Sequence, residues 1–148
     1  MSLLTNQKLR DYQKQANTWS GFGVLALLFI MLFFYFSIED DTVLPCYLTG
    51  LNIAVVFPAL RSRKLAKPSP GIRSWSMLIL NLIVIVYIDY SMVARQWPAF
   101  LHWNNYLPHS LDSALMWVCF AAMAICLETA NYYGYLHEAE LNALKQES

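Results

Sequence analysis

Four long apolar runs constrain this chain more than any other feature, because each is long enough to cross a bilayer. They cover roughly residues 20–37, 44–60, 75–94 and 111–134. A helix needs about 20 mostly apolar residues to cross about 30 Å of hydrocarbon. The runs are continuously apolar, whereas the strands of a membrane barrel alternate. The sequence therefore predicts an all-α membrane protein with four transmembrane helices.

The composition supports a single membrane domain. Hydrophobic residues make up 57% of the 148 residues and charged residues only 14%, a balance typical of proteins that cross the membrane several times. Because the four spans use most of the chain, we expect residues 1–148 to form one four-helix membrane domain. Because a polar segment precedes the first span, we expect this span to be retained as a helix and not cleaved as a signal peptide.

The basic residues predict the orientation of the spans. Eight of the ten Lys and Arg residues fall before the first span or between the second and third: Lys8, Arg10, Lys14, Arg61, Arg63, Lys64, Lys67 and Arg73. The positive-inside rule places that side in the cytoplasm, which gives an N-in, C-in topology. We expect the basic loop to meet anionic lipid headgroups, and we expect no nucleic-acid partner.

Two segments outside the spans are expected at the membrane surface. Leu9, Tyr12, Ala16 and Trp19 recur at spacings of three and four, which predicts an amphipathic N-terminal arm helix on the inner surface; a mobile polar tail is the alternative. In the third connection, Pro98 can open a short helix that Pro108 ends. The candidates for interfacial or lipid contact are Trp19, Arg61, Arg63, Arg73, Trp75, Trp97 and Trp103.

Two carboxylates lie within the apolar runs. Asp89 is about 8 Å from the outer end of its span at 1.5 Å per residue, and Glu128 lies at a similar depth from the opposite surface. They are therefore too far apart to act as one acid–base pair. A buried charge is a functional candidate by default, but a packing or interfacial role is favoured here. Asn52 and Asn81 are expected to form interhelical hydrogen bonds.

The fourth run contains one stripe of small and polar residues that predicts a packing face. Its members recur at spacings of three and four: Ala114, Trp117, Ala121, Ala124, Glu128 and Asn131. Small residues let another helix approach closely in lipid. Glu128 falls near the level of three arginines, Arg61, Arg63 and Arg73, so an ion pair with one of them would fasten the bundle.

No familiar pattern of catalytic or metal-binding residues occurs in the sequence. His102, His109 and His137 all fall outside the spans, and Cys46, Cys119 and Cys126 form no CxxC motif. HExxH, GxSxG and Gly-rich phosphate loops are likewise missing. We therefore expect no enzyme activity, metal or cofactor.

Three segments, in order, resemble a known family. They read CYLTGLNIAVVFPALRSRK, RSWSMLILNLIVIVYIDYSMVARQW and LPHSLDSALMWVCFAAMAICLETANYYGY. This order is similar to that in the small, Q-type membrane subunit of tripartite ATP-independent periplasmic (TRAP) transporters, most of all in the TAXI branch. In that family basic residues often follow the Leu-Glu-Thr-Ala segment, whereas Asn131 and Tyr132 stand here.

The resemblance implies a scaffold role in the bacterial inner membrane. Such a subunit supports a large elevator-type membrane subunit, which takes up organic acids with sodium after a periplasmic substrate-binding protein delivers them. Membrane lipids would be its other contacts. Two alternatives remain open from the residues: a homodimeric proton-coupled exporter that uses Glu128, and a four-helix membrane-embedded transferase.

Overall fold

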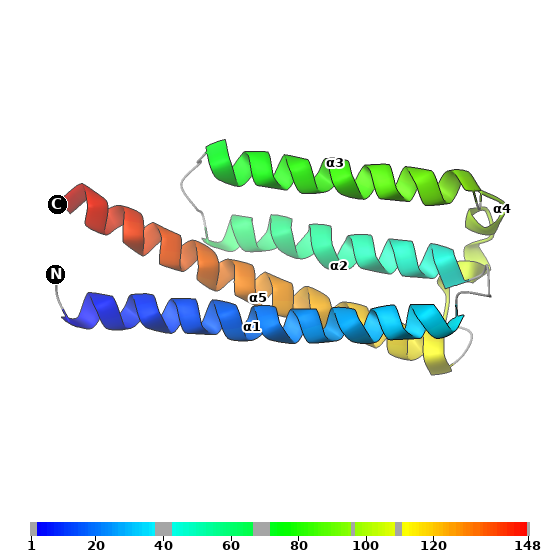
Figure 1. Ribbon diagram of the computed structural model, residues 1–148, viewed down its shortest axis with the longest axis horizontal. Coiled ribbons are helices and arrows are strands. Elements are labelled where there is room, and N and C mark those ends of the chain that lie inside the picture. Colours follow the sequence, from blue (N-terminus) through cyan, green and yellow to red (C-terminus); the bar gives the residue numbers. More distant parts are fainter. Residues whose placement is uncertain (1–2, 38–42, 67–71, 96, 109–110, 148) are drawn as a thin grey trace.

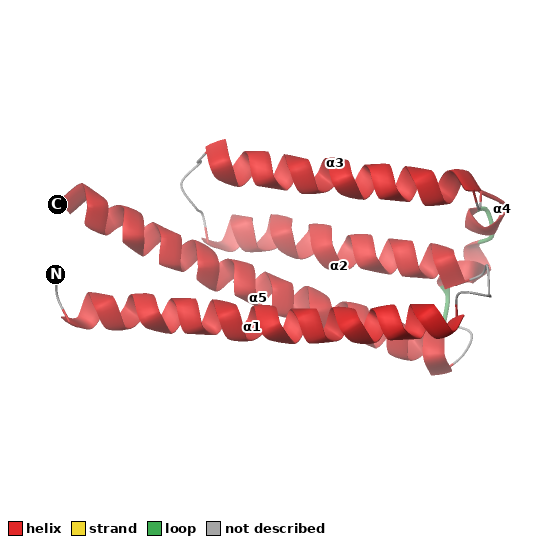
Figure 2. Ribbon diagram, in the orientation of Figure 1, coloured by secondary structure: helices red, strands yellow, loops and turns green. Residues whose placement is uncertain are grey.

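The chain forms a bundle of long helices (Figure 1). The computed structural model describes residues 3–37, 43–66, 72–95, 97–108 and 111–147. In chain order the elements are α1 (Leu3–Ser37), α2 (Val43–Ala66), α3 (Ile72–Arg95), α4 (Trp97–Phe100), the 3-10 turn η1 (Trp103–Tyr106) and α5 (Leu111–Glu147). Within these ranges only short loops interrupt the helices, and no strand is present (Figure 2).

Four of these helices, α1, α2, α3 and α5, are long and apolar enough to cross a membrane. This finding confirms the four spans expected from the sequence and indicates a multi-pass membrane protein. Helices suit this setting because their backbone hydrogen bonds are satisfied internally. Both termini lie at the same end of the bundle, and α4 and η1 lie at the other end (Figure 1).

The helix α1 includes the segment expected to form a separate arm. It runs from Leu3 to Ser37 without a break, and α1 and α5 both extend beyond α2 and α3 at the end where the termini lie (Figure 1). Leu9 is buried, and the ring of Tyr12 lies 6.3 Å from that of Tyr133 on α5. The apolar stripe that predicted the arm therefore helps α1 to pack along α5, so residues 3–19 continue the first span.

The helix α2 also passes its expected end at residue 60. It contains Pro58 and continues to Ala66. A proline inside a helix lacks the N–H that would donate to the carbonyl four residues earlier, here that of Ala54, yet α2 continues without a break. One turn further on, the hydroxyl of buried Ser62 donates to the carbonyl oxygen of Pro58 at 2.6 Å. Arg61, Arg63 and Lys64 consequently lie on the last turns of a helix, and the expectation that they occupy a loop is wrong.

Three of the four long helices build the core. The buried cluster contains Ile30 of α1, Cys46 and Ala54 of α2, and Met116, Phe120 and Met123 of α5. The contact of α1 with α5 is the most extensive, followed by that of α2 with α5. Among the long helices, α3 contacts only α2, and its described residues contribute nothing to this cluster. The core is therefore α1, α2 and α5, with α3 attached at its edge.

Aromatic rings join the three core helices in one row. The ring of Phe34 on α1 stacks on Tyr47 of α2, with centroids 4.1 Å apart. Tyr47 in turn lies 6.2 Å from Phe120 of α5, and Phe120 packs edge-on against Trp117 at 5.7 Å. Such ring pairs contribute about 0.5–1.5 kcal/mol each beyond the area that they bury.

The segment between α3 and α5 folds back onto α2. Pro98 is the second residue of α4, as its preference for the first helical turn predicts. The side-chain amide of Asn105 donates to the backbone carbonyl of Ala99 at 2.8 Å. The hydroxyl of Tyr106 donates to the backbone carbonyl of Phe100 at 3.2 Å. Both α4 and η1 contact α2, so this segment closes one end of the bundle.

Candidate functional site

A hydrogen bond between Asn52 and Asp89 joins α2 to α3. The side-chain amide of Asn52 donates to Oδ2 of Asp89, and both side chains are half-buried. The expectation that Asn52 bonds across helices is confirmed; the side chain of Asn81 lies outside the described part. In an apolar environment each of these groups would otherwise lack a partner. The pair therefore fastens the one helix that the core does not hold.

An ion pair joins α2 to α5 near the opposite end of these spans. Nε of Arg61 lies 3.1 Å from Oε1 of Glu128, with side-chain exposures of 56% and 23%. The guanidinium also lies over the ring of Phe57, with Cζ 5.9 Å from the centroid. Because Arg61 is more than half exposed, solvent screens this pair and its contribution to stability is small. Its main consequence is positional, since it fixes the Glu128 carboxylate against α2.

Part of the predicted packing stripe on α5 packs within this chain. Trp117 and Ala124 pack against the core cluster, and Ala114, Glu128 and Asn131 are half-buried. Ala121, however, is exposed. The face that meets α1 and α2 is centred on Met116, Phe120 and Met123. The stripe predicted from small residues is thus rotated away from the true centre of packing.

Small residues on the neighbouring helices make room for this face. A Cβ atom at Gly50 of α2 would overlap the ring of Phe120, and one at Gly23 of α1 would lie 3.5 Å from Leu127. Sequence reasoning sought the small residues on α5 and missed these glycines on its neighbours. The available signal was a glycine in the middle of an apolar run, where close helix approach is its common role.

The candidates for interfacial contact are spread over both ends of the bundle. Trp97 and Trp103 are 56% and 71% exposed at the α4 end. Trp19, near the middle of α1, is half-buried, with its ring 6.0 Å from that of Phe22. Arg63, close to the end of α2, is also half-buried. The backbone of α3 includes Arg73 and Trp75, whose side chains fall outside the described part.

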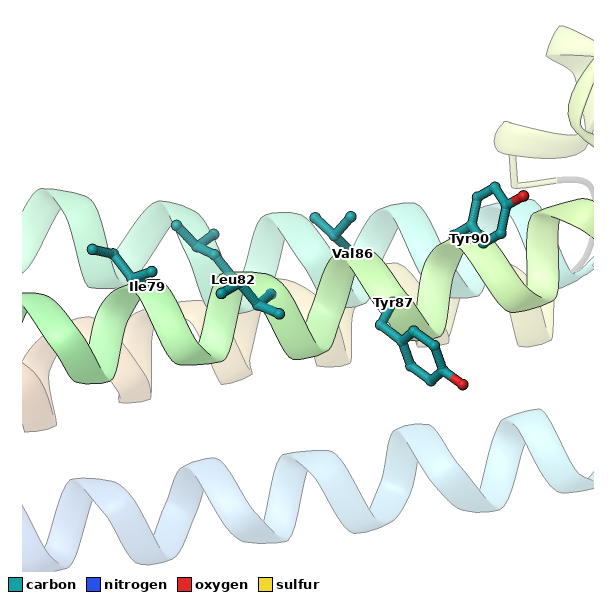
Figure 3. A pocket seen from close by; sticks show the side chains of 6 residues that line it. Ile79, Leu82, Val86, Tyr87 and Tyr90 are labelled. Carbon is teal, nitrogen blue, oxygen red and sulfur yellow. The ribbon is translucent and has the colours of Figure 1, made fainter.

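Two larger hollows appear on the surface of the described chain. One, of about 510 Å³, is lined by α3 alone and is almost wholly apolar; Figure 3 shows Ile79, Val86 and Tyr90 on one side of this helix and Tyr87 on the other. The other, of about 550 Å³, is lined by residues of α1, α2, α3 and α5, among them Asn52 and Asp89. Only the second is formed by several helices.

The described residues contain no group of three or more His, Cys, Asp and Glu side chains that could hold a metal ion. Cys46 and Cys126 are buried, Cys119 is half-buried, and all three are free thiols. These thiols fill space in the packing of α2 and α5, since a buried cysteine behaves as a small apolar residue.

Comparison of the chain with protein-family models, curated proteins and solved structures found no significant match. The geometry therefore carries the functional argument, and the family resemblance stays a prediction.

The rotated packing face leads to a prediction for two alanines of α5. Ala124→Leu is expected to lower stability by about 1–3 kcal/mol, because it adds volume beside a filled core. Ala121→Leu is expected to leave the isolated chain unaffected, since Ala121 is exposed. Thermal unfolding of each purified variant measures this, with Ala122→Leu as the exposed control. Equal melting of all three variants would contradict the assigned face.

Proposed function

We propose that this chain is a small integral-membrane scaffold subunit that supports a larger membrane protein. One observation carries the proposal: the two carboxylates in the apolar runs, Asp89 and Glu128, are both engaged within the chain. Asp89 accepts from Asn52, and Glu128 pairs with Arg61. Polar side chains that bond between membrane helices hold those helices together. Each of these carboxylates connects α2 to a neighbouring helix in this way.

The attachment of α3 supports the same proposal. Its described residues contribute nothing to the core, and apolar side chains such as Ile83, Val86 and Tyr87 are largely exposed. In lipid, helix association depends on close packing and on interhelical hydrogen bonds rather than on hydrophobicity. A helix whose described side chains make one polar contact with another long helix and leave a broad free surface therefore suits a subunit that completes its packing against a partner.

The resemblance noted in the sequence names the partner. By that resemblance, the larger protein is the elevator-type subunit of a TRAP transporter of the TAXI type. It would take up organic acids with sodium, supplied by a periplasmic substrate-binding protein, in the bacterial inner membrane. The proposal assigns the transport site to the large subunit and assigns no catalytic step to this chain.

The proposed topology places both termini in the cytoplasm. Lys8, Arg10 and Lys14 lie near the start of α1, at the end of the bundle that also holds the basic end of α2. The positive-inside rule then assigns this end to the cytoplasm. Cysteines substituted for Asp40 and Ser69, which lie outside the described residues, are expected to react with impermeant reagents from opposite sides. Reaction from one side only would contradict the topology.

Gentle purification of the tagged full chain from its native membrane tests the scaffold role. The expected result is a complex with one much larger multi-span protein, identified by mass spectrometry. Glu128→Gln is expected to leave both assembly and substrate uptake intact, because glutamine can still accept a hydrogen bond from Arg61. A homodimer without a larger partner would instead favour an exporter that uses Glu128. Loss of uptake while assembly is intact would show that ionised Glu128 takes part in transport.

A further inference from the structure

The groove of about 550 Å³ lies between α1 and α3, with α2 and α5 behind it. Val24 lines it from α1, Leu51 from α2, Val84 from α3 and Leu127 from α5. The described parts of α1 and α3 make no direct backbone contact. The two helices therefore form opposite walls of one concave surface.

The length of the groove matches one leaflet of a bilayer. Its α3 residues run from Val84 to Met92, about 12 Å at 1.5 Å per residue. One leaflet contributes about 15 Å of the hydrocarbon thickness. Because α3 ends at Arg95, the groove begins just inside the α4 end of the bundle and stops near the middle of the bilayer.

The walls are suited to hydrocarbon. Asn52 and Asp89 line the groove and bond to each other. Apart from Tyr47, the other lining side chains are apolar, and the surface of the groove is mostly apolar. A helix of 10–12 Å diameter occupies roughly 140 Å³ per residue. The groove, however, extends over only about 12 Å of α3, less than half of the roughly 30 Å that a spanning helix crosses. A slender chain fits this volume better.

A cation lies on α3 one turn beyond the last lining residue of the groove. Arg95 follows Met92 by three residues and so lies on the same side of α3, and it is exposed. Exposed Trp97 follows at the start of α4. A guanidinium binds phosphate oxygens with strong, charge-assisted hydrogen bonds, and tryptophan favours the headgroup level. An anionic group at the top of an acyl chain would meet both residues.

We propose that this groove holds one acyl chain of a phospholipid from the leaflet at the α4 end, with the lipid phosphate beside Arg95. The lipid fills the space between α1 and α3 and holds α3 in position. This inference concerns the chain alone and does not depend on the proposed scaffold function.

Native mass spectrometry of the full chain tests the lipid site. The chain is first reconstituted in nanodiscs of palmitoyl-oleoyl phosphatidylglycerol and is then released into a mild detergent. Wild type is expected to retain one phospholipid. Val84→Trp fills part of the groove, and retention of the phospholipid is expected to fall about tenfold. This is the change in affinity expected when roughly two methylene groups of the acyl chain lose their contacts with the protein. Val86→Trp is the matched control, because Val86 lies on the surface formed by α3 alone (Figure 3).

Further variants keep the result decisive. Val24→Trp makes the same test from the opposite wall if Val84→Trp fails to fold by circular dichroism. Arg95→Gln is expected to weaken phospholipid retention severalfold without unfolding the chain. Equal lipid retention by the Val84→Trp and Val86→Trp variants would overturn the proposal. A photo-crosslinker at position 84 that captures another polypeptide in the native membrane, instead of a lipid, would also overturn it.

Discussion

Gly50→Ala is expected to cause a large loss of stability, although it adds a single methyl group. The new Cβ atom would overlap the ring of Phe120, which is 3% exposed and packs against Tyr47 and Trp117. The ring therefore has no free space to enter. Overpacking costs about 1–3 kcal/mol, more than the roughly 0.5–1 kcal/mol that alanine contributes over glycine within a helix.

Two comparisons isolate the effect of this contact. Gly21→Ala is the control, because no atom lies within 4 Å of the added Cβ, and it is expected to be neutral or slightly stabilising. Phe120→Leu, combined with Gly50→Ala, is expected to recover part of the loss by shortening the opposing side chain. Thermal unfolding in detergent reports all of these variants. If Gly50→Ala melts at the same temperature as Gly21→Ala, the close approach of α2 and α5 is wrong.

Asp89→Leu is expected to release α3 from the bundle. The change leaves the Asn52 amide without its acceptor in an apolar wall, and the described part of α3 has no core residue that compensates. An unsatisfied buried polar group costs about 1–3 kcal/mol. Hydrogen exchange of α3 peptides in nanodiscs is expected to quicken, while peptides of α1 and α5 keep their protection. Asp89→Asn is the matched control, because its side-chain oxygen can still accept the hydrogen bond.

A double-mutant cycle separates the bond from other effects of these substitutions. Asn52→Leu alone is expected to be about as harmful as Asp89→Leu, whereas the double variant should lose less than the sum of the two. The expected coupling is about 0.6–1.7 kcal/mol, the range for hydrogen bonds between membrane helices. Additive losses would show that the two side chains do not act on each other, and α3 would then need another attachment.

The arrangement of helices explains why these two variants should act differently. Gly50 lies within the core of α1, α2 and α5, so its substitution disturbs the packing that holds three helices together. Asp89 lies on the helix outside that core, so its substitution acts on one attachment. Thermal unfolding of the whole bundle is therefore the measurement suited to Gly50→Ala, and hydrogen exchange of α3 is the one suited to Asp89→Leu.

The sequence alone predicted the four spanning helices, because length and apolarity are sufficient for that conclusion. It also predicted the short helix at Pro98, the interhelical role of Asn52 and the nearness of Glu128 to a group of arginines. Each of these follows from local rules: the fixed backbone angle of proline, and the cost of leaving a polar side chain unpaired in lipid. Such rules apply wherever the helices happen to pack.

The tertiary structure decided the rest. Leu9 and Tyr12 belong to one continuous helix, α1, because α5 offers them a packing surface. Asp89, rather than another group, became the partner of Asn52 because, in the described part of the chain, α2 is the only long helix that α3 contacts. The face of α5 that packs within this chain is centred on Met116, Phe120 and Met123, which the sequence did not indicate, because a helix that is apolar on every side shows little difference between its faces. Large residues such as Phe120 could face inward only because Gly50, on another helix, leaves the space that the ring occupies.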